Sequence, residues 1–319
     1  MEIKYISIIL FLSTIFAIII GKIFIPILKK RHIGQNIRDD GPKSHLAKQG
    51  TPTMGGIIIA ITLIAGIIAL SKFDLPLGIV LLCTFGFGAV GFIDDFMKLI
   101  MRRSLGLNAK QKIVLQVLIS AIVVFLYKRY SLESFSYLKV PFIGKNIDIG
   151  AFIYILIPFV LIGTVNAVNL TDGLDGLVSS VTIPVLPFLL IVSAGVESVQ
   201  GFVIVLMGSV LGFLVFNSNK ASVFMGDTGS MTIGGAIAGL ALVTNTVFFL
   251  PIFGLIYVIE AGSVIIQVIS YKTRNKKRVF LMSPIHHHYE LKGYNEQKIV
   301  TSFSIISLLA VLVAVMGYF

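Results

Sequence analysis

Four polar side chains that could do chemistry lie in the stretch Asn166-Ala-Val-Asn-Leu-Thr-Asp-Gly-Leu-Asp-Gly-Leu177, between two long apolar runs. Asn166, Asn169, Asp172 and Asp175 recur every three residues, so a helix or a tight turn could place them on one face. The two Asp-Gly pairs predict a chain break, where glycine lets the backbone approach a ligand. Carboxylates are costly near hydrocarbon and are usually kept there for function. We therefore interpret this stretch as a candidate substrate site.

Two adjacent carboxylates, Asp94 and Asp95, end another apolar run and are followed by Lys98. Adjacent carboxylates repel each other and need a cation or a proton to coexist. Lys98 lies one helical turn away, which fits either an ion pair or recognition of a substrate phosphate. A solvated helix end is the structural alternative. It leaves unexplained why the acids precede the basic flank, so we favour a functional role.

Asp227 lies among glycines and hydroxyl residues in the stretch Phe224-Met-Gly-Asp-Thr-Gly-Ser230. An aspartate among small residues is a common ligand for a hard cation such as Mg²⁺, which takes oxygen donors and keeps several waters. Capping of the helix that follows is an equally ordinary role for Asp227 or Thr228. The two roles are compatible.

The stretch Lys48-Gln-Gly-Thr-Pro-Thr-Met-Gly-Gly56 begins another apolar run. Glycines and free amides at a helix start favour phosphate, and Lys48 adds a positive charge. A basic flank followed by a helix start explains the same residues. Sequence alone leaves both interpretations open.

Three consecutive histidines, His286, His287 and His288, lie in Ser283-Pro-Ile-His-His-His-Tyr-Glu290. Consecutive side chains diverge and the chain has no cysteine nearby, which argues against a structural zinc site. Imidazoles that bind phosphate or sugar hydroxyls fit better.

The composition indicates what kind of molecule carries these stretches. Of 319 residues, 56% are hydrophobic and 13% are charged, and the mean hydropathy is +0.96. A soluble protein has about 25% charged residues, so the chain is predicted to be an integral membrane protein. The net charge of +11 flanks apolar runs, which favours membrane topology over nucleic acid as its explanation. The lone Cys83 excludes an intrachain disulfide framework.

The fold class predicted is an all-α polytopic membrane protein formed by a single domain, residues 1–319. Ten apolar runs are expected to be transmembrane helices, with a kink at Pro184 and Pro187 in the sixth. These runs are 5–28, 54–71, 76–97, 111–127, 151–168, 177–194, 199–216, 230–248, 250–270 and 299–318.

The distribution of basic residues predicts the orientation. Nineteen of the 26 Lys and Arg residues fall in the connections 29–53, 98–112, 217–229 and 271–298. The positive-inside rule makes that side cytoplasmic and places both termini outside. All the polar stretches above then lie on the cytoplasmic side. On the outer side, residues 133–150 are expected to form a β-hairpin in which Phe135, Tyr137 and Leu138 face Ile147 and Ile149 across a turn from Pro141 to Asn146.

Acids, lysines and histidines that converge on one membrane face favour chemistry on a charged cytoplasmic molecule with a membrane-embedded partner. Phosphoryl transfer is the natural class, because it needs a metal, cationic groups and positioning more than covalent machinery.

The motifs NAVNLTDGLDGL, FIDDFMK, KQGTPTMGG, FMGDTGS and SPIHHHYE closely resemble those of the polyprenyl-phosphate N-acetylhexosamine-1-phosphate transferases, and within them the phospho-N-acetylmuramoyl-pentapeptide transferases. The resemblance runs from about residue 43 to the end of the chain. It implies a ten-helix, Mg²⁺-dependent enzyme of the bacterial cytoplasmic membrane. Such an enzyme moves phospho-MurNAc-pentapeptide from UDP to undecaprenyl phosphate, giving lipid I and UMP for peptidoglycan synthesis. It also implies a homodimer among membrane lipids.

The resemblance implies roles for particular residues. Asp227 is the expected Mg²⁺ ligand, and Asp94 is expected to activate the lipid phosphate with help from Asp95. Contacts to the nucleotide sugar are expected from Lys48, Thr53, Asn169, Asp172, Asp175, Asn217, Phe224 and Gln267, with Phe224 suited to stack on uracil. Phosphates or the sugar side are expected to be held by Lys110 and by His286, His287 and His288. Asp172 as a second, transient metal contact is left open.

Two other functions compete with this interpretation. A related enzyme could use UDP-GlcNAc, although the SPIHHHYE and TPTMGG motifs favour the muramoyl branch. An ion-coupled secondary transporter would instead place its acids near the bilayer midplane on broken helices, whereas these acids cluster at helix ends. Within the enzyme class, direct attack by the lipid phosphate is preferred to a covalent intermediate on an aspartate, because the lipid phosphate is already an anionic nucleophile.

Overall fold

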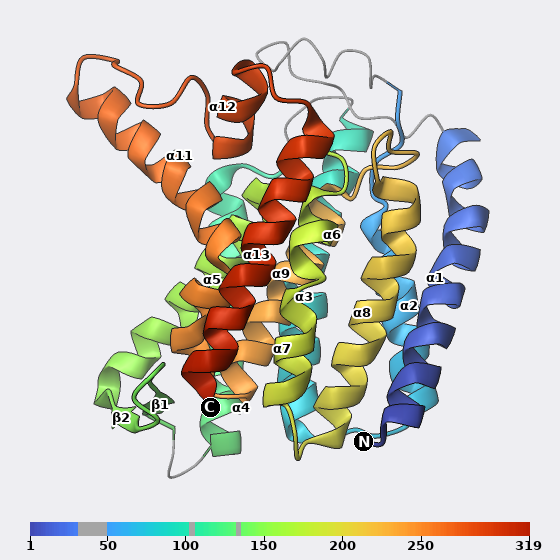
Figure 1. Ribbon diagram of the computed structural model, residues 1–319, viewed down its shortest axis with the longest axis vertical. Coiled ribbons are helices and arrows are strands. Elements are labelled where there is room, and N and C mark those ends of the chain that lie inside the picture. The colour runs from blue at the N-terminus through green and yellow to red at the C-terminus, as the bar shows by residue number, and fades with distance from the viewer. Residues whose placement is uncertain (31–49, 102–105, 132–134) are drawn as a thin grey trace.

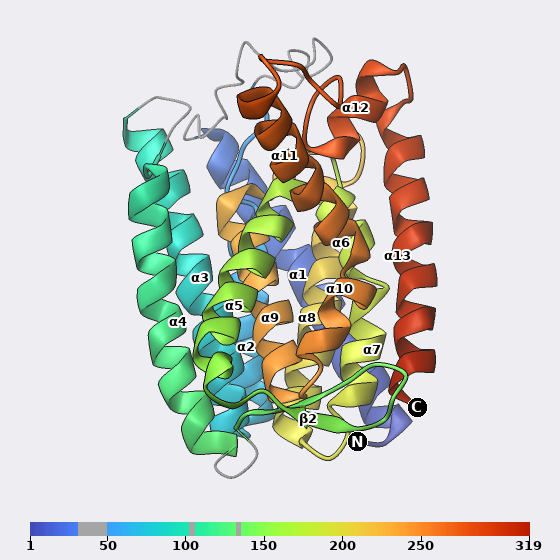
Figure 2. The ribbon, with the colours of Figure 1, turned by 90° about the vertical axis from the view of Figure 1, so that its left-hand side faces the viewer.

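The computed structural model describes residues 1–30, 50–101, 106–131 and 135–319. Helices run side by side through most of the molecule, and both chain termini lie at the same end (Figures 1 and 2). The elements in chain order are α1 Ile3–Lys30, α2 Gly56–Leu70, α3 Leu75–Ile100, α4 Ala109–Ser131, β1 Tyr137–Lys139, β2 Asn146–Asp148, η3 Gly150–Phe152, α5 Ile153–Thr171, α6 Leu177–Thr182, α7 Val185–Val192, α8 Glu197–Asn217, α9 Gly226–Val243, η4 Val247–Phe249, α10 Leu250–Phe253, α11 Leu255–Thr273, α12 Ile285–Leu291 and α13 Glu296–Tyr318.

Seven of the helical stretches in the described residues are long and apolar enough to cross a membrane: α1, α3, α4, the stretch Gly150–Thr171 formed by η3 and α5, α8, α11 and α13. Two shorter apolar stretches are α2 and Leu177–Val192, which covers α6 and α7. Each of the ten predicted runs falls on helix, but a count of ten spans is not confirmed. The chain is a multi-pass, mainly helical membrane protein.

The centre of the bundle is built on close contact between α3 and α9, the most extensively packed pair of described elements. A methyl group on Gly91 would overlap the carbonyl oxygen of Asp227, and one on Gly235 would overlap that of Cys83. Small residues let helix backbones approach closely where no hydrophobic force drives helices together. This contact brings the end of α3 and the start of α9 together.

The sixth predicted run is broken at Pro184, as expected. Pro184 has no N–H to donate to the carbonyl of Ser180, and α6 ends at Thr182. Two hydroxyls of α13 compensate: Ser304 donates to the Ser180 carbonyl at 2.9 Å, and Ser307 to the Val181 carbonyl at 2.8 Å. Pro187 lies in the first turn of α7, where its missing N–H breaks no helical bond.

The predicted hairpin is confirmed as a two-stranded antiparallel sheet in which Leu138 pairs with Ile147. Its turn, residues 140–145, lies one residue earlier than expected, because β1 ends at Lys139 and Asn146 belongs to β2. The Phe142 N–H donates to the Gly317 carbonyl at 2.8 Å, so the hairpin is tied to the end of α13. Both strands lie at the end of the molecule that carries the chain termini, opposite α12 (Figure 1).

Candidate active site

Three carboxylates meet where α3 ends and α9 begins. Asp94 and Asp95 lie near the end of α3 and are each 2% exposed, and Asp227 lies in the first turn of α9. One oxygen from each carboxylate lies within 4.8 Å of the other two. Because like charges this close repel each other, the cluster requires cations nearby.

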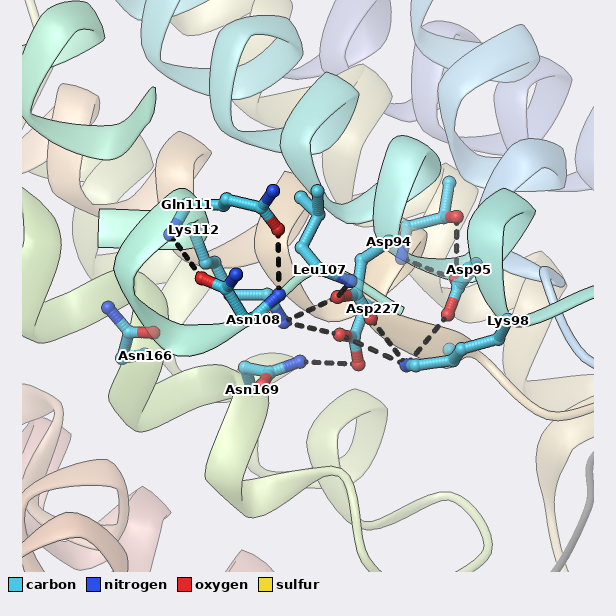
Figure 3. Close-up of polar contacts among 12 residues, drawn as sticks. Asp94, Asp95, Lys98, Leu107, Asn108, Gln111, Lys112, Asn166, Asn169 and Asp227 are labelled. Atoms are coloured by element: carbon cyan, nitrogen blue, oxygen red, sulfur yellow. Dashed lines mark hydrogen bonds and ion pairs between the residues drawn. The ribbon is translucent and has the colours of Figure 1, made fainter. Parts of the chain in front are cut away.

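Two lysines supply positive charge to this acidic cluster (Figure 3). Lys98 Nζ lies 2.6 Å from Asp94 Oδ2, 3.3 Å from Asp95 Oδ1 and 3.2 Å from Asp227 Oδ2. Lys112, on α4, lies 2.7 Å from Asp227 Oδ2 and 3.4 Å from Asp94 Oδ1. Two ammonium groups against three carboxylates leave one formal negative charge, which favours a further cation.

Asp95 holds the start of α9. Its Oδ2 accepts hydrogen bonds from the Thr228 N–H at 2.9 Å and the Thr228 hydroxyl at 2.7 Å. A carboxylate at a helix N-terminus satisfies a free N–H and interacts favourably with the helix dipole. The predicted alternative, in which Asp227 or Thr228 caps this helix, is therefore replaced by a cap from another helix.

Gly226 makes this arrangement possible. Its φ of +72° is in the left-handed region that side chains disfavour, and a Cβ there would lie 2.6 Å from Asp95 Oδ2 and 2.9 Å from Thr53 Oγ1. Thr53 is buried next to this glycine. The chain can turn into α9 beside the carboxylate only because residue 226 lacks a side chain.

Asp94 is held by the segment between α3 and α4. The Leu107 N–H donates to Asp94 Oδ1 at 2.9 Å, and a methyl group on Gly106 would overlap the Asp94 carbonyl. Its two oxygens therefore face Leu107, Lys98 and Lys112 (Figure 3).

Asn169 and Asp172 join the acidic cluster from the end of α5. Asn169 Nδ2 donates to Asp227 Oδ1 at 3.0 Å and to Ser230 Oγ at 2.9 Å. Asp172 follows the last residue of α5 and accepts a hydrogen bond from the Gly226 N–H. Burial, with the neighbouring Asp227 and Asp95 carboxylates, raises the pKa of Asp172 to about 8. Asp172 is thus one more acid beside the candidate metal ligand.

Asn166 and Asp175 do not share this face. Asn166 Nδ2 donates to Gln116 Oε1 at 2.9 Å, and Gln116 Nε2 donates back at 3.4 Å, which joins α5 to α4. Asp175 Oδ2 accepts the Ala221 N–H at 3.0 Å. The three-residue rhythm fails as a guide here, because α5 ends at Thr171 and the later residues follow a turn.

Asn217 is the last residue of α8, and Phe224 lies in the connection from α8 to α9. Asn217 Oδ1 accepts the Gly176 N–H at 3.1 Å, and its Nδ2 donates to the Val223 carbonyl at 3.1 Å. The Phe224 N–H donates to the Pro52 carbonyl and the Phe224 carbonyl accepts the Gly55 N–H, both at 2.8 Å. These bonds join residues 172–176, 217–225 and 52–56 around the cluster. The Phe224 side chain is half-buried.

Two predicted residues lie elsewhere, and a third, Lys48, is outside the described residues. Lys110 is exposed on the first turn of α4, and the structure places Lys112 at the acidic cluster instead. Gln267 of α11 makes three hydrogen bonds to the segment before α12: Nε2 donates to the Phe280 carbonyl at 2.9 Å, and Oε1 accepts the N–H groups of Val279 and Phe280.

The three histidines lie on α12, and each ring has a different partner. His286 Nδ1 lies 3.0 Å from Glu260 Oε2, and His287 Nδ1 lies 2.7 Å from Glu290 Oε2. His288 Nδ1 accepts the Leu281 N–H at 3.1 Å. His286 is fully buried. The three rings have different polar partners, but the side chains do not all diverge as expected, because the centroids of the His286 and His287 rings lie 4.1 Å apart.

The donor set of the acidic cluster suits a hard divalent cation. Asp94, Asp95 and Asp227 offer only carboxylate oxygens, the ligand type that Mg²⁺ prefers. Asp227 lies between the other acids and both lysines, whereas Asp95 Oδ2 is used by the cap of α9 and Asp94 Oδ1 accepts the Leu107 N–H. The residues therefore fit the predicted metal.

Comparison with known proteins agrees with this geometry. Residues 77–245 match the model of glycosyl transferase family 4, and residues 48–59 match phospho-N-acetylmuramoyl-pentapeptide-transferase signature 1. The phospho-N-acetylmuramoyl-pentapeptide-transferase of Clostridioides difficile (strain 630) is 46% identical over 321 residues, covering 100% of this chain and 98% of the relative. The chain belongs to the phospho-N-acetylmuramoyl-pentapeptide-transferase family.

Other members of this family are similar over nearly their whole length. The enzyme of Caldanaerobacter subterraneus subsp. tengcongensis is 44% identical over 305 residues, covering 95% of each chain. That of Bacillus anthracis is 46% identical over 303 residues, covering 93% of each chain.

Sequence reasoning missed Lys112, Ser230 and Glu260 as contributors to the site or its support. Lys112 lies two residues beyond Lys110, and a helix of unknown starting point gives no means to choose between them. Glu260 could have been identified from the sequence, since a carboxylate inside an apolar run is rare without a partner.

Proposed function

We propose that this protein transfers phospho-MurNAc-pentapeptide from UDP to undecaprenyl phosphate, with Mg²⁺ as cofactor, and so forms lipid I and UMP. One observation carries the proposal: three carboxylates and two lysines converge at the junction of α3, α4 and α9, beside turns fixed by the predicted substrate residues. Phosphoryl transfer depends on such an arrangement of charge more than on a covalent enzyme intermediate.

Mg²⁺ would be held by Asp227, with Asp94 beside it, and would supply neutralisation of the phosphate charge. Asp95 is a positioning residue, because both of its oxygens face Thr228 or Lys98. Asp172 stays a candidate for a second contact, since its carboxylate is held next to Asp227 by the Gly226 N–H.

Among the described residues, Lys98 and Lys112 are the cationic groups that contact the cluster, and they neutralise part of its charge. When a phosphate enters, the same ammonium groups can turn to its oxygens at little cost, because lysine is a flexible point charge with three donors. They would stabilise charge that develops on the phosphate oxygens in the transition state.

The reaction that fits is a direct displacement. An oxygen of the lipid phosphate forms a bond to the β-phosphorus of the nucleotide sugar, the bond from that phosphorus to UMP breaks, and UMP leaves with the electron pair. Asp94 orients and activates the lipid phosphate. A covalent route through Asp94 is less favoured, because the Leu107 N–H and two ammonium groups already bind its oxygens and weaken it as a nucleophile.

The turns around the cluster suit the nucleotide sugar. Asp175 and Asn217 fix the backbone of residues 172–176 and 217–225, and Asn169 and Asp172 contact the start of α9. Phe224 beside them can stack on uracil. His287 and His288 of α12 lie on the same end of the molecule and suit the phosphates or the sugar. We place this end on the cytoplasmic side, with both termini outside and the protein a homodimer.

Exchange of labelled UMP into UDP-MurNAc-pentapeptide tests the proposal. With Mg²⁺ present, exchange and lipid I formation should both require undecaprenyl phosphate, and Asp227→Asn and Asp94→Asn should each abolish them. Exchange without the lipid phosphate, with labelled phospho-sugar trapped on Asp94 or Asp227, would replace the direct route by the covalent one. Transfer from UDP-GlcNAc in place of the muramoyl donor would overturn the assigned substrate. Solute flux in sealed vesicles without UMP release would indicate a transporter.

A further inference from the structure

Glu260 and His286 form a buried pair that the proposed chemistry does not use. Glu260 lies on α11 and His286 on α12, both are 0% exposed, and Glu260 Oε2 lies 3.0 Å from His286 Nδ1. Their other polar atoms, Glu260 Oε1 and His286 Nε2, have no hydrogen-bond partner within the described residues. A carboxylate inside a membrane-spanning helix is costly, so its retention calls for a specific role.

The far side of the His286 ring touches the turn that follows α5. A methyl group on Gly173 would overlap His286 Nε2. Gly173 follows Asp172, whose carboxylate accepts the Gly226 N–H next to Asp227. The ring therefore lies between Glu260 and a turn that ends at the acidic cluster.

The carboxylate constrains the chemistry of the ring. An ionised Glu260 can only accept a hydrogen bond, so Nδ1 must carry the proton at this contact. The hydrogen bond made by one ring nitrogen sets the protonation of the other. Glu260 thus fixes both the orientation of the ring and the nitrogen that faces Gly173.

Glu260 is not needed to fold α12 back onto α11. Gln267 already makes three hydrogen bonds to Val279 and Phe280, and Ser270 donates to the Lys277 carbonyl at 2.9 Å. The Glu260 carboxylate binds only His286 among the described residues. The contribution of the Glu260 carboxylate is therefore specific to the His286 ring.

We propose that Glu260 is a positioning residue that, through His286, holds residues 172–176 in place for the nucleotide sugar. This inference rests on the proposed function. It predicts an effect on binding of the nucleotide sugar, because the turn contacts that substrate and the reacting carboxylates are held independently by Thr228 and Leu107.

Steady-state kinetics of Glu260→Gln test the proposal, since glutamine keeps the shape and removes the charge. The KM for UDP-MurNAc-pentapeptide should rise about tenfold, as expected for loss of a hydrogen bond to a charged group, while kcat and the KM for undecaprenyl phosphate change less than about threefold. Ser263→Ala is the matched control. Ser263 is equally buried on α11, one turn away, and its hydroxyl donates to the Glu260 carbonyl rather than to the ring.

Nitrogen NMR of histidine-labelled protein supplies a readout independent of catalysis. His286 should carry its proton on Nδ1 in the unaltered protein, and Glu260→Gln should lose this restriction while Ser263→Ala keeps it. Gly173→Ala adds a methyl group on the other side of the ring and should also raise the KM for UDP-MurNAc-pentapeptide. In the double variant with Glu260→Gln, this KM should be no higher than in either single variant.

Three results would overturn the proposal: an unchanged KM in Glu260→Gln, a rise of the same size in Ser263→Ala, or additive effects in the double variant. Failure of the unaltered protein to make lipid I would instead refute the proposed function. The Nδ1 signature of His286 would still test the pair in that case.

Discussion

Lys112 Nζ lies 2.7 Å from Asp227 Oδ2 and 3.4 Å from Asp94 Oδ1, so a lysine of α4 joins carboxylates of α3 and α9. Lys110, two residues earlier on the same helix, is exposed. The two lysines thus offer a matched pair that differs in position rather than in chemistry.

Replacement of Lys112 by glutamine should lower kcat/KM for lipid I formation by about 10²–10³-fold, the size expected for loss of one preorganised group that stabilises transition-state charge. Lys110→Gln should lower it less than about fivefold, because an exposed charge contributes little. Steady-state kinetics on both variants in the same detergent check this. Equal losses would mean that both lysines contact substrate.

Substitutions of Asp94 and Asp95 should differ in their effects on stability, although both acids belong to the same cluster. Asp94→Asn should abolish transfer with little change in melting temperature. Asp95→Asn should also lower the free energy of unfolding by about 1–3 kcal/mol, because it weakens the charged cap of Thr228 and α9. Thermal unfolding in detergent, followed beside lipid I formation, distinguishes the two. Thr228→Val should reproduce the stability loss, and a stable Asp95→Asn would contradict the capping role.

Close packing of α3 on α9 predicts that Gly91→Ala moves Asp94 and Asp95 away from Asp227. The added methyl group overlaps the Asp227 carbonyl, at a cost of about 1–3 kcal/mol for overpacking. Both melting temperature and kcat should fall. Gly78→Ala on the same helix is the control, because no atom lies within 4 Å of its Cβ position and alanine stabilises a helix interior by about 0.5–1 kcal/mol. Equal melting temperatures for the two variants would show that α3 and α9 tolerate separation.

Mg²⁺ should stabilise the protein through Asp227. Free metal at about 100 times its dissociation constant adds about 2.7 kcal/mol to the free energy of unfolding. Melting temperature should therefore rise with Mg²⁺ and return when EDTA is added. Asp227→Asn should remove the response, whereas Asp148→Asn, an exposed acid on β2 at the opposite end of the molecule, should keep it. A metal response that survives in Asp227→Asn would place the ion elsewhere.

Hydropathy predicted much of the fold, because the length of an apolar run depends only on the local sequence. The ten apolar runs fall on helix, and the break at Pro184 and the pairing of Leu138 with Ile147 were found where expected. The inclusion of Asn146 in β2 and the end of α5 at Thr171 were not predicted, since the exact position of a turn and of a helix end depends on tertiary contacts.

The acidic residues of the candidate site were predicted from the sequence, whereas the residues that hold them in place were predicted less well. Asp94, Asp95 and Asp227 are conspicuous because carboxylates in apolar surroundings need a reason, and the structure brings all three together. Lys112 and the cap from Asp95 to Thr228 depend on which helices touch, and no periodicity within one segment contains that information. Gln267 and Asn217 resembled ligand contacts, but in this structure their amides hold neighbouring backbone.

Pro184 affects contacts beyond the apolar stretch that it interrupts. In a bilayer, apolar helix surfaces can slide past one another with little penalty, so hydrogen bonds across them determine vertical alignment. The carbonyls of Ser180 and Val181 accept Ser304 and Ser307 of α13, and α12 ends only a few residues before α13 begins. The carbonyl that Pro184 leaves without a helical donor thus becomes an attachment point for α13, the helix that follows the one carrying His286.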